Sequence, residues 1–197
     1  MRLSEPTKRI LYELEADWPE DRKQVGQELE SLPWQYNISG FEHRAQVRTH
    51  EYDFKTKPLL GQIVDDIKKN QASMFETLWA NPEFSQGIWP GTTLKQLQNN
   101  VDFIVEFNRD DPGWRTGVHI DHRAGVAIGM LFFEQTNDKN MSTYFYTTER
   151  RDNEQRMSCE YGRGWLAANT HASWHTGGNM SRESRYSVSF SWFLRLK

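Results

Sequence analysis

The stretch that decides the fold is Arg185-Tyr-Ser-Val-Ser-Phe-Ser-Trp-Phe-Leu-Arg-Leu196, near the end of the chain. Side chains alternate across a β-strand, so two sets of residues face opposite ways. The apolar set is Tyr186, Val188, Phe190, Trp192 and Leu194, and the polar set is Arg185, Ser187, Ser189 and Ser191. We predict a strand whose apolar face is covered by helices and whose polar face lines a cavity. A surface strand with a solvated serine face is the alternative.

Further strands are expected upstream. Val101-Asp-Phe-Ile-Val-Glu-Phe107 alternates in the same way, and Asp110-Asp-Pro-Gly113 follows it as a predicted turn. The other strand candidates are residues 125–133, 143–147 and 165–170. The second half of the chain therefore has the pattern of a β-rich core.

The first hundred residues have helical spacing instead of alternation. Ser4 is a candidate N-cap for the first of three amphipathic helices. The apolar positions that mark these helices are Ile10, Leu11 and Leu14, then Val25, Leu29 and Leu32, then Leu59, Leu60, Ile63, Val64 and Ile67, the last helix running from Pro58 to about Asn70. We expect one domain, 1–197, with a mainly helical support region at 1–100 and a β core at 101–197 that carries the site.

Composition narrows the class of protein. The 197 residues include 24 Lys and Arg against 27 Asp and Glu, a net charge of −3 that disfavours a nucleic-acid partner. The single cysteine, Cys159, excludes an intramolecular disulfide and a Cys-rich zinc module. No signal-peptide run begins the sequence, and no stretch is apolar enough to cross a membrane. We expect a cytoplasmic protein without a membrane partner; its oligomeric state is left open.

A candidate metal-binding pattern follows the predicted turn, in Gly117-Val-His119-Ile-Asp121-His122. On an extended segment His119 and Asp121 lie on the same side, so both side chains can reach one ion. Taken alone, a His-x-Asp is more often part of a polar loop. His122 partly imitates the dinuclear-zinc hydrolase motif His-x-His-x-Asp-His, but Gly117 stands where that motif needs its first histidine.

A second histidine makes the pattern more specific. His175 lies in Asn169-Thr-His171-Ala-Ser-Trp-His175-Thr-Gly-Gly178, 54 positions after Asp121 and ten before Arg185. Two histidines and one carboxylate form the facial triad of non-haem Fe(II) oxygenases, which leaves positions open on the metal. His171 competes for the same role, but the Gly-Gly turn directly after His175 favours His175, with His171 placed beside the site.

Arg185 and Ser187 share the polar face of the last strand. A guanidinium offers a planar fork to a carboxylate, and a neighbouring hydroxyl can donate one more hydrogen bond. An iron-chelating keto acid with a distal carboxylate would fit this pair together with the metal. Trp114, Trp165 and Trp174 flank the predicted site and are interpreted as core or pocket-wall residues.

The order His119, Asp121, His175 and Arg185 resembles the pattern of the Fe(II)/2-oxoglutarate-dependent dioxygenases, particularly the prolyl-hydroxylase-like branch. The resemblance covers roughly Val101 to Phe193. Two departures stand out: Met130-Leu-Phe-Phe133 has phenylalanine where the branch often has tyrosine, and Ser142-Thr143 replaces a frequent Gly-Gly.

The resemblance implies a mainly β fold with buttressing helices, a double-stranded β-helix or jelly roll. It implies that His119, Asp121 and His175 are the catalytic iron ligands, that Arg185 binds the distal carboxylate of 2-oxoglutarate, and that Ser187 supports it. The cofactors would be Fe(II), 2-oxoglutarate and O₂. The expected reaction is hydroxylation of an amino-acid-like small molecule or a peptidyl side chain, with decarboxylation of 2-oxoglutarate to succinate.

Two alternatives stay open at this point. A jelly roll with the same polar cavity can be a non-catalytic binding module for a sugar or an organic acid. A nucleic-acid-modifying oxygenase of the same fold is the other alternative, which the negative net charge disfavours.

Overall fold

The computed structural model describes residues 1–4, 10–36, 43–121, 124–134, 138–170 and 173–195. Its helices are α1 (Arg22–Glu30), α2 (Pro58–Ala80) and α3 (Leu94–Asn99), with shorter helical turns η1 (Thr49–Glu51), η2 (Phe54–Thr56), η3 (Glu83–Ile88) and η4 (Lys139–Met141). Its strands are β1 (Arg2–Leu3), β2 (Leu11–Glu15), β3 (Gln35–Tyr36), β4 (Arg44–Arg48), β5 (Val101–Asp110), β6 (Gly125–Phe132), β7 (Thr143–Tyr146), β8 (Gln155–Arg156), β9 (Arg163–Ala168), β10 (Trp174–Gly177) and β11 (Arg185–Leu194).

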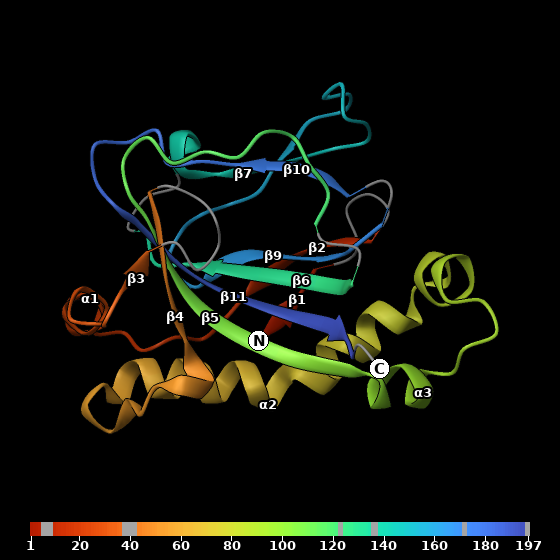
Figure 1. Cartoon of the computed structure of the whole chain (residues 1–197), viewed down its shortest axis with the longest axis horizontal. Helices are drawn as coiled ribbons and strands as arrows, with labels where there is room; N and C mark the ends of the chain where they lie inside the picture. The colour runs from red at the N-terminus through yellow and green to blue at the C-terminus, as the bar shows by residue number, and fades with distance from the viewer. Residues whose placement is uncertain (5–9, 37–42, 122–123, 135–137, 171–172, 196–197) are drawn as a thin grey trace.

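Two antiparallel sheets lie face to face. The larger sheet has the strand order β1-β2-β9-β6-β11-β5-β4-β3, and the smaller has the order β10-β7-β8. Figure 1 shows the small sheet above the large one and α2 below it, so the large sheet is covered on both faces. The structure therefore confirms the prediction of a mainly β jelly roll with buttressing helices.

Strand β11 lies between β5 and β6 in the large sheet and has the two faces that its sequence predicts. Val188, Phe190 and Trp192 are buried on the helix side, where Trp192 packs on Phe75 of α2 with ring centroids 5.4 Å apart. Ser187 and Ser191 are buried on the opposite side, which faces the small sheet. The alternative of a fully solvated serine face is thereby excluded.

Helix α2 provides the cover for the apolar face. Its buried residues recur at helical spacing and form one stripe, which consists of Leu60, Ile63, Val64, Ile67, Met74, Phe75 and Leu78. Pro58 is the first residue of the helix, and the backbone N–H groups of Leu59 and Leu60 donate to the carboxylate of Glu28 in α1 at 3.1 and 3.0 Å. The predicted helix is correct in position but extends ten residues beyond Asn70.

The first predicted helix is wrong, because Leu11 to Glu15 form strand β2. Leu11 packs between the two sheets while Tyr12 and Leu14 pack on the helix side, so both faces of the strand are apolar. A strand buried on both faces loses strict alternation and resembles a short helical pattern. Ser4 does not cap a helix; its hydroxyl accepts a hydrogen bond from the backbone N–H of Glu13.

The predicted turn also begins one residue too early, because Asp110 is the last residue of β5 and is completely buried. In the register of the large sheet, Asp110 pairs with Arg185 of β11 on one side and with Arg44 of β4 on the other. The polar face of β11 therefore continues across β5 and β4, which forms the floor of the site.

Within the described ranges, no helix has the length and apolar character needed to cross a membrane.

Candidate metal centre

The two halves of the predicted triad meet through backbone pairing. Residues 115 to 119 run antiparallel beside β10, and His119 and His175 exchange both backbone hydrogen bonds at 2.9 and 2.8 Å. Thr116 extends this pairing, since its N–H donates to the carbonyl of Gly177. This segment thus pairs with β10, the edge strand of the small sheet, and brings His119 directly opposite His175.

The hydrogen bonds of the two imidazoles determine which nitrogen is free. Nδ1 of His119 lies 2.9 Å from the carbonyl oxygen of Gly117, and Nδ1 of His175 lies 3.0 Å from that of Ser173. A carbonyl oxygen only accepts, so each neutral ring carries its proton on Nδ1 and leaves Nε2 as the lone-pair nitrogen. Backbone carbonyls commonly orient metal-binding histidines in this way.

The free nitrogens converge on one carboxylate. Nε2 of His119 lies 3.9 Å from Oδ1 of Asp121, and Nε2 of His175 lies 3.7 Å from the same oxygen. One ligand-type atom from each of the three residues lies within 4.8 Å of the other two, which matches the donor set of a single metal ion. The His-x-Asp and the distant histidine are therefore brought together as the spacing predicts.

The three residues differ in exposure. The side chains of His119 and Asp121 are 37% and 27% exposed, whereas that of His175 is 9% exposed. Phe145 stacks on the His175 ring at 5.3 Å between centroids, and Trp165 lies at 6.1 Å. Burial in this aromatic wall lowers the pKa of His175, and the nearby Asp121 carboxylate opposes that effect without overcoming it. His175 is consequently neutral at pH 7 and available as a ligand.

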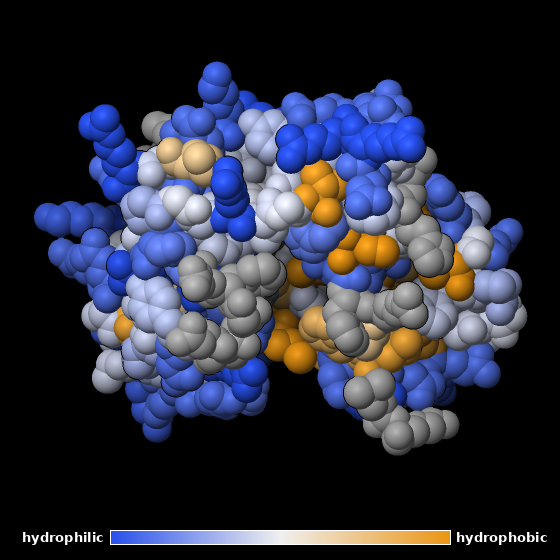
Figure 2. Space-filling view, turned by 45° about the horizontal axis from the view of Figure 1, so that its top comes forward, coloured by the Kyte–Doolittle hydropathy of each residue, from blue (hydrophilic) through white to orange (hydrophobic). Residues whose placement is uncertain are grey.

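A cavity of about 110 Å³ begins at this group and extends between the sheets. The triad lines it together with Met130 and Trp165 on the apolar side and with two cationic residues, Arg44 and Arg185. Figure 2 shows a hollow near the middle of the face in view, with hydrophobic residues visible inside it.

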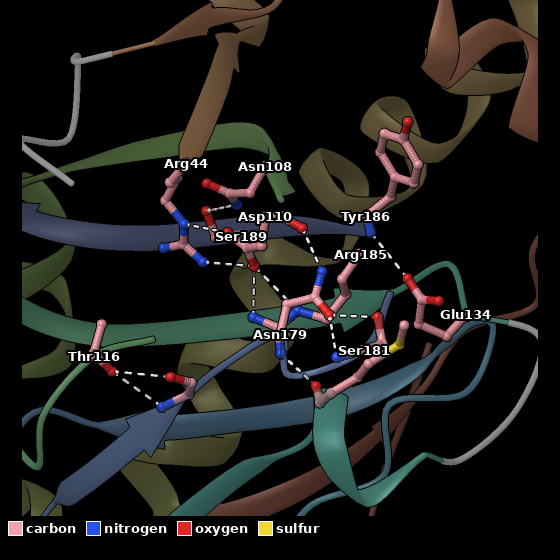
Figure 3. Close-up of polar contacts among 12 residues, drawn as sticks. Arg44, Asn108, Asp110, Thr116, Glu134, Asn179, Ser181, Arg185, Tyr186 and Ser189 are labelled. Carbon is pink, nitrogen blue, oxygen red and sulfur yellow. Dashed lines mark hydrogen bonds and ion pairs between the residues drawn. The ribbon is translucent and has the colours of Figure 1, made fainter. Parts of the chain in front are cut away.

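Arg185 lies in the interior with its charge compensated. It is 1% exposed, and its Nε and Nη2 atoms lie 3.0 and 2.5 Å from Oδ2 of Asp110, while Nη1 donates to the carbonyl of Met141. Arg44 approaches the same carboxylate from β4, with Nε 2.5 Å from Oδ1 (Figure 3). Asp110 therefore lies between two guanidinium groups.

The electrostatics of Asp110 follow from this geometry. Complete burial on its own would raise the pKa of the carboxyl group, but the attraction of Arg44 and Arg185 outweighs that effect. The pKa of Asp110 consequently lies below its ordinary value, and the residue is ionised at neutral pH.

Ser187 lies beside Arg185 on the inner face and is fully buried. Its hydroxyl oxygen has no hydrogen-bond partner in the part of the chain that the structure describes, and neither has Nε1 of Trp165. Unpaired buried polar atoms are uncommon because each loses its hydration without compensation. Trp165 lines the cavity, whereas Ser187 is not among its lining residues and lies on the same face of β11 as Arg185, which does line it. The N–H of Trp165, which has no partner among the described residues, fits a site that receives a polar ligand.

Sequence reasoning missed Arg44 and Asp110, the two residues that form an ion cluster with Arg185. Asp110 was assigned to a turn, although Glu106, Asn108 and Asp110 alternate in phase with the serines of β11 and could have indicated the polar face. Arg44 had no comparable signal, because its strand is only five residues long and lies far from the site in sequence. Trp114 and Trp165 are buried in the cavity wall, as interpreted. The two competing histidines, His122 and His171, lie outside the described residues.

Comparison with known proteins adds information at the level of the fold. The sequence matches no protein-family model and no curated protein. Among solved structures, the chain is similar to a prolyl-4-hydroxylase of Pseudomonas putida, with a TM-score of 0.60 and 11% identity over 96% of this chain and 95% of the other.

Two further structures give the same result. A prolyl hydroxylase of Trichoplax adhaerens, in complex with a hypoxia-inducible-factor peptide, has a TM-score of 0.59 and 10% identity over 94% of this chain and 84% of the other. HygX of Streptomyces hygroscopicus, with nickel and 2-oxoglutarate bound, has a TM-score of 0.54 and 8% identity over 94% of this chain and 83% of the other. The chain has the fold of the prolyl hydroxylases and related 2-oxoglutarate/Fe(II) oxygenases, and at that level the sequence resemblance is confirmed.

Proposed function

We propose that this protein is an Fe(II)- and 2-oxoglutarate-dependent dioxygenase that hydroxylates an amino-acid-like small molecule or a peptidyl side chain. The observation that carries the proposal is the convergence of His119, Asp121 and His175 at one cavity, with their ligand-type atoms within 4.8 Å of one another. The fold shared with 2-oxoglutarate/Fe(II) oxygenases supports the same class.

The donor set suits a ferrous ion. Two neutral imidazoles and one carboxylate, placed on one side of an ion, leave other coordination positions open, as oxygenase chemistry requires. His175 would be held rigidly by the aromatic wall. The greater exposure of His119 and Asp121 indicates that the substrate approaches from their side of the cavity.

The other end of the cavity suits the cosubstrate. Arg185 would attract the distal carboxylate of 2-oxoglutarate, and the hydroxyl of Ser187, which has no partner among the described residues, would donate a hydrogen bond to it. When bound, the metal and keto acid supply the activation of O₂, coupled to decarboxylation of 2-oxoglutarate to succinate. The protein's part is to orient the cosubstrate and to exclude water with Met130, Trp114 and Trp165.

The proposed substrate class is supported by the similar structures and by the net charge of the chain. Several similar structures are prolyl hydroxylases, and one of them holds a peptide. The net charge of −3 gives no electrostatic reason for a nucleic-acid substrate. An amino-acid-like or peptidyl substrate is consequently preferred.

Two measurements test the proposal. The first is calorimetric titration with Mn(II), a redox-inert substitute for Fe(II), followed by 2-oxoglutarate; the second is succinate formation under O₂ with Fe(II), 2-oxoglutarate and a panel of amino acids and peptides. We expect stoichiometric metal binding that His175→Ala abolishes. His50→Ala is the matched control, because the His50 side chain is 63% exposed and is not among the residues that line the cavity.

The outcomes separate the alternatives. Binding of sugars or organic acids without any affinity for Mn(II) would identify a non-catalytic binding module instead. Succinate formation that depends on an oligonucleotide would identify a nucleic-acid-modifying enzyme. If His175→Ala binds Mn(II) as well as His50→Ala and the wild type do, the assigned ligand set is refuted.

A further inference from the structure

The cluster of Arg44, Asp110 and Arg185 contains an unbalanced charge. Asp110 is fully buried, Arg185 is 1% exposed, and the side chain of Arg44 is 11% exposed. Two guanidinium groups share one carboxylate, so these three side chains together carry a net charge of +1. Glu106 and Glu134 also attract Arg44 and Arg185, respectively, but in the described part of the chain neither lies within ion-pair distance of them. Each guanidinium pairs with Asp110, but the single carboxylate balances only one of the two charges, so the cluster can accept one further anion.

The hydrogen-bond inventory shows which arginine has a nitrogen that donates to no protein group among the described residues. Each of the three nitrogens of Arg185 already donates, two to Asp110 and one to the carbonyl of Met141. Arg44 uses Nε and Nη2 for Asp110, at 2.5 and 3.0 Å. Its Nη1 donates to no acceptor in the described part of the chain, so at least two of its five N–H groups are free.

The position of Arg44 directs these free donors. Its guanidinium carbon lies 3.8 Å from the ring centroid of Trp114, which fixes the plane of the group by stacking. Both residues line the cavity that contains His119, Asp121 and His175. Figure 3 shows Arg44 extending from β4 toward Asp110 beside Arg185. The arrangement is therefore an oriented cation at the cavity wall, held by Asp110 and Trp114.

We propose that Arg44 is a cosubstrate-binding residue, whose free Nη1 edge receives the distal carboxylate of 2-oxoglutarate beside Arg185. Asp110 and Trp114 act as positioning residues for it. The inference rests on the proposed function, and it extends the binding site to strand β4, outside the region from Val101 onward that carries the sequence resemblance. One bound carboxylate would neutralise the excess charge of the cluster.

The test compares two keto acids that differ in one group. Mn(II)-loaded protein is titrated calorimetrically with 2-oxoglutarate and with 2-oxopentanoate, which has the same carbon chain without the distal carboxylate. Loss of a charge-assisted hydrogen bond predicts that Arg44→Met weakens 2-oxoglutarate binding by roughly tenfold to a hundredfold. Binding of 2-oxopentanoate should change less than about twofold, because the keto acid no longer carries the group that Arg44 receives.

Arg48→Met is the matched control. Arg48 lies on the same face of the same strand, pairs with Glu106 at 3.6 Å, and is not among the cavity-lining residues. The same substitution there should leave the affinity for both keto acids unchanged. Arg44→Gln is a second variant in case Arg44→Met does not fold, since its amide keeps one donor for Asp110; intact Mn(II) affinity reports the fold, and we expect the same selective loss.

The possible results are distinct. Wild-type affinity of Arg44→Met or Arg44→Gln for 2-oxoglutarate would overturn the inference and leave the proposed function standing. Equal weakening of both keto acids would also overturn it, because Arg44 would then act through the metal or the fold. A wild-type protein that binds Mn(II) but no 2-oxoglutarate would overturn the proposed function, and this inference with it.

Discussion

Replacing Asp110 by asparagine removes the single negative charge between two buried guanidinium groups while preserving the shape of the side chain. At about 4 Å and an effective dielectric constant of about 20, each attraction is worth about 4 kcal/mol, so the two partners together contribute about 8 kcal/mol. The desolvation of the carboxylate offsets several kcal/mol of this gain. We expect Asp110→Asn to lower the free energy of unfolding by about 3–5 kcal/mol.

The assay is equilibrium unfolding in urea, compared with a control on the same strand. Asp102→Asn is chemically the same change, and Asp102 pairs with Arg195 at 2.7 Å, but both side chains are more than half exposed. An exposed pair contributes at most about 1 kcal/mol, so this variant should lose little stability. If Asp110→Asn costs no more than Asp102→Asn, the buried cluster does not stabilise the fold as argued.

The same ion cluster predicts a pH dependence with a definite sign. The pKa of Asp110 is lowered in the folded state, so below its ordinary value of 3.8 the unfolded chain binds more protons than the folded one. The contribution of Asp110 is complete above that value and is lost as the pH falls through the lowered pKa. Acid titration of stability should show this loss in the wild type and a smaller one in Asp110→Asn.

Three further predictions concern other parts of the fold. Gly129→Ala should cost about 1–3 kcal/mol in urea unfolding, because the added Cβ would lie 2.3 Å from the Phe190 ring; a second change, Phe190→Leu, should recover part of the loss. The lowered pKa of His175 predicts that stability decreases as the pH falls below its ordinary 6.5, and His175→Asn should remove that dependence in the same assay. Thr93→Ala removes the capping box with Gln96 and should lower the thermal midpoint by an amount that corresponds to about 1 kcal/mol.

The strands of the β core were largely predictable because their pattern is local. Period-two alternation identifies β5 and β11 wherever the strands lie in the sheet, and it assigns Ser187 and Val188 to opposite faces. The same reasoning failed for Leu11 to Leu14, because burial on both sides depends on the layers above and below the strand. The hydrophobic pattern of a strand depends on which of its faces are buried, and the packing of the whole fold decides this.

The candidate site was predictable to the extent that its chemistry is written in residue type and spacing. His119, Asp121, His175 and Arg185 could be chosen by the donor set that a metal and a carboxylate need, and the structure places all four at one cavity. The orientation of the imidazoles could not be chosen in this way, because it depends on the carbonyls of Gly117 and Ser173.

By itself, the sequence determined which residues share a face of each strand and which residue types are available for a metal, since both follow from the chain's own geometry and chemistry. Tertiary structure alone decided which strands are neighbours. Arg44 and Asp110 are 66 positions apart and meet only because β4 pairs with β5, and the register of that pairing depends on packing over the whole sheet. The second guanidinium of the cavity is therefore a property of the fold, which no local pattern contains.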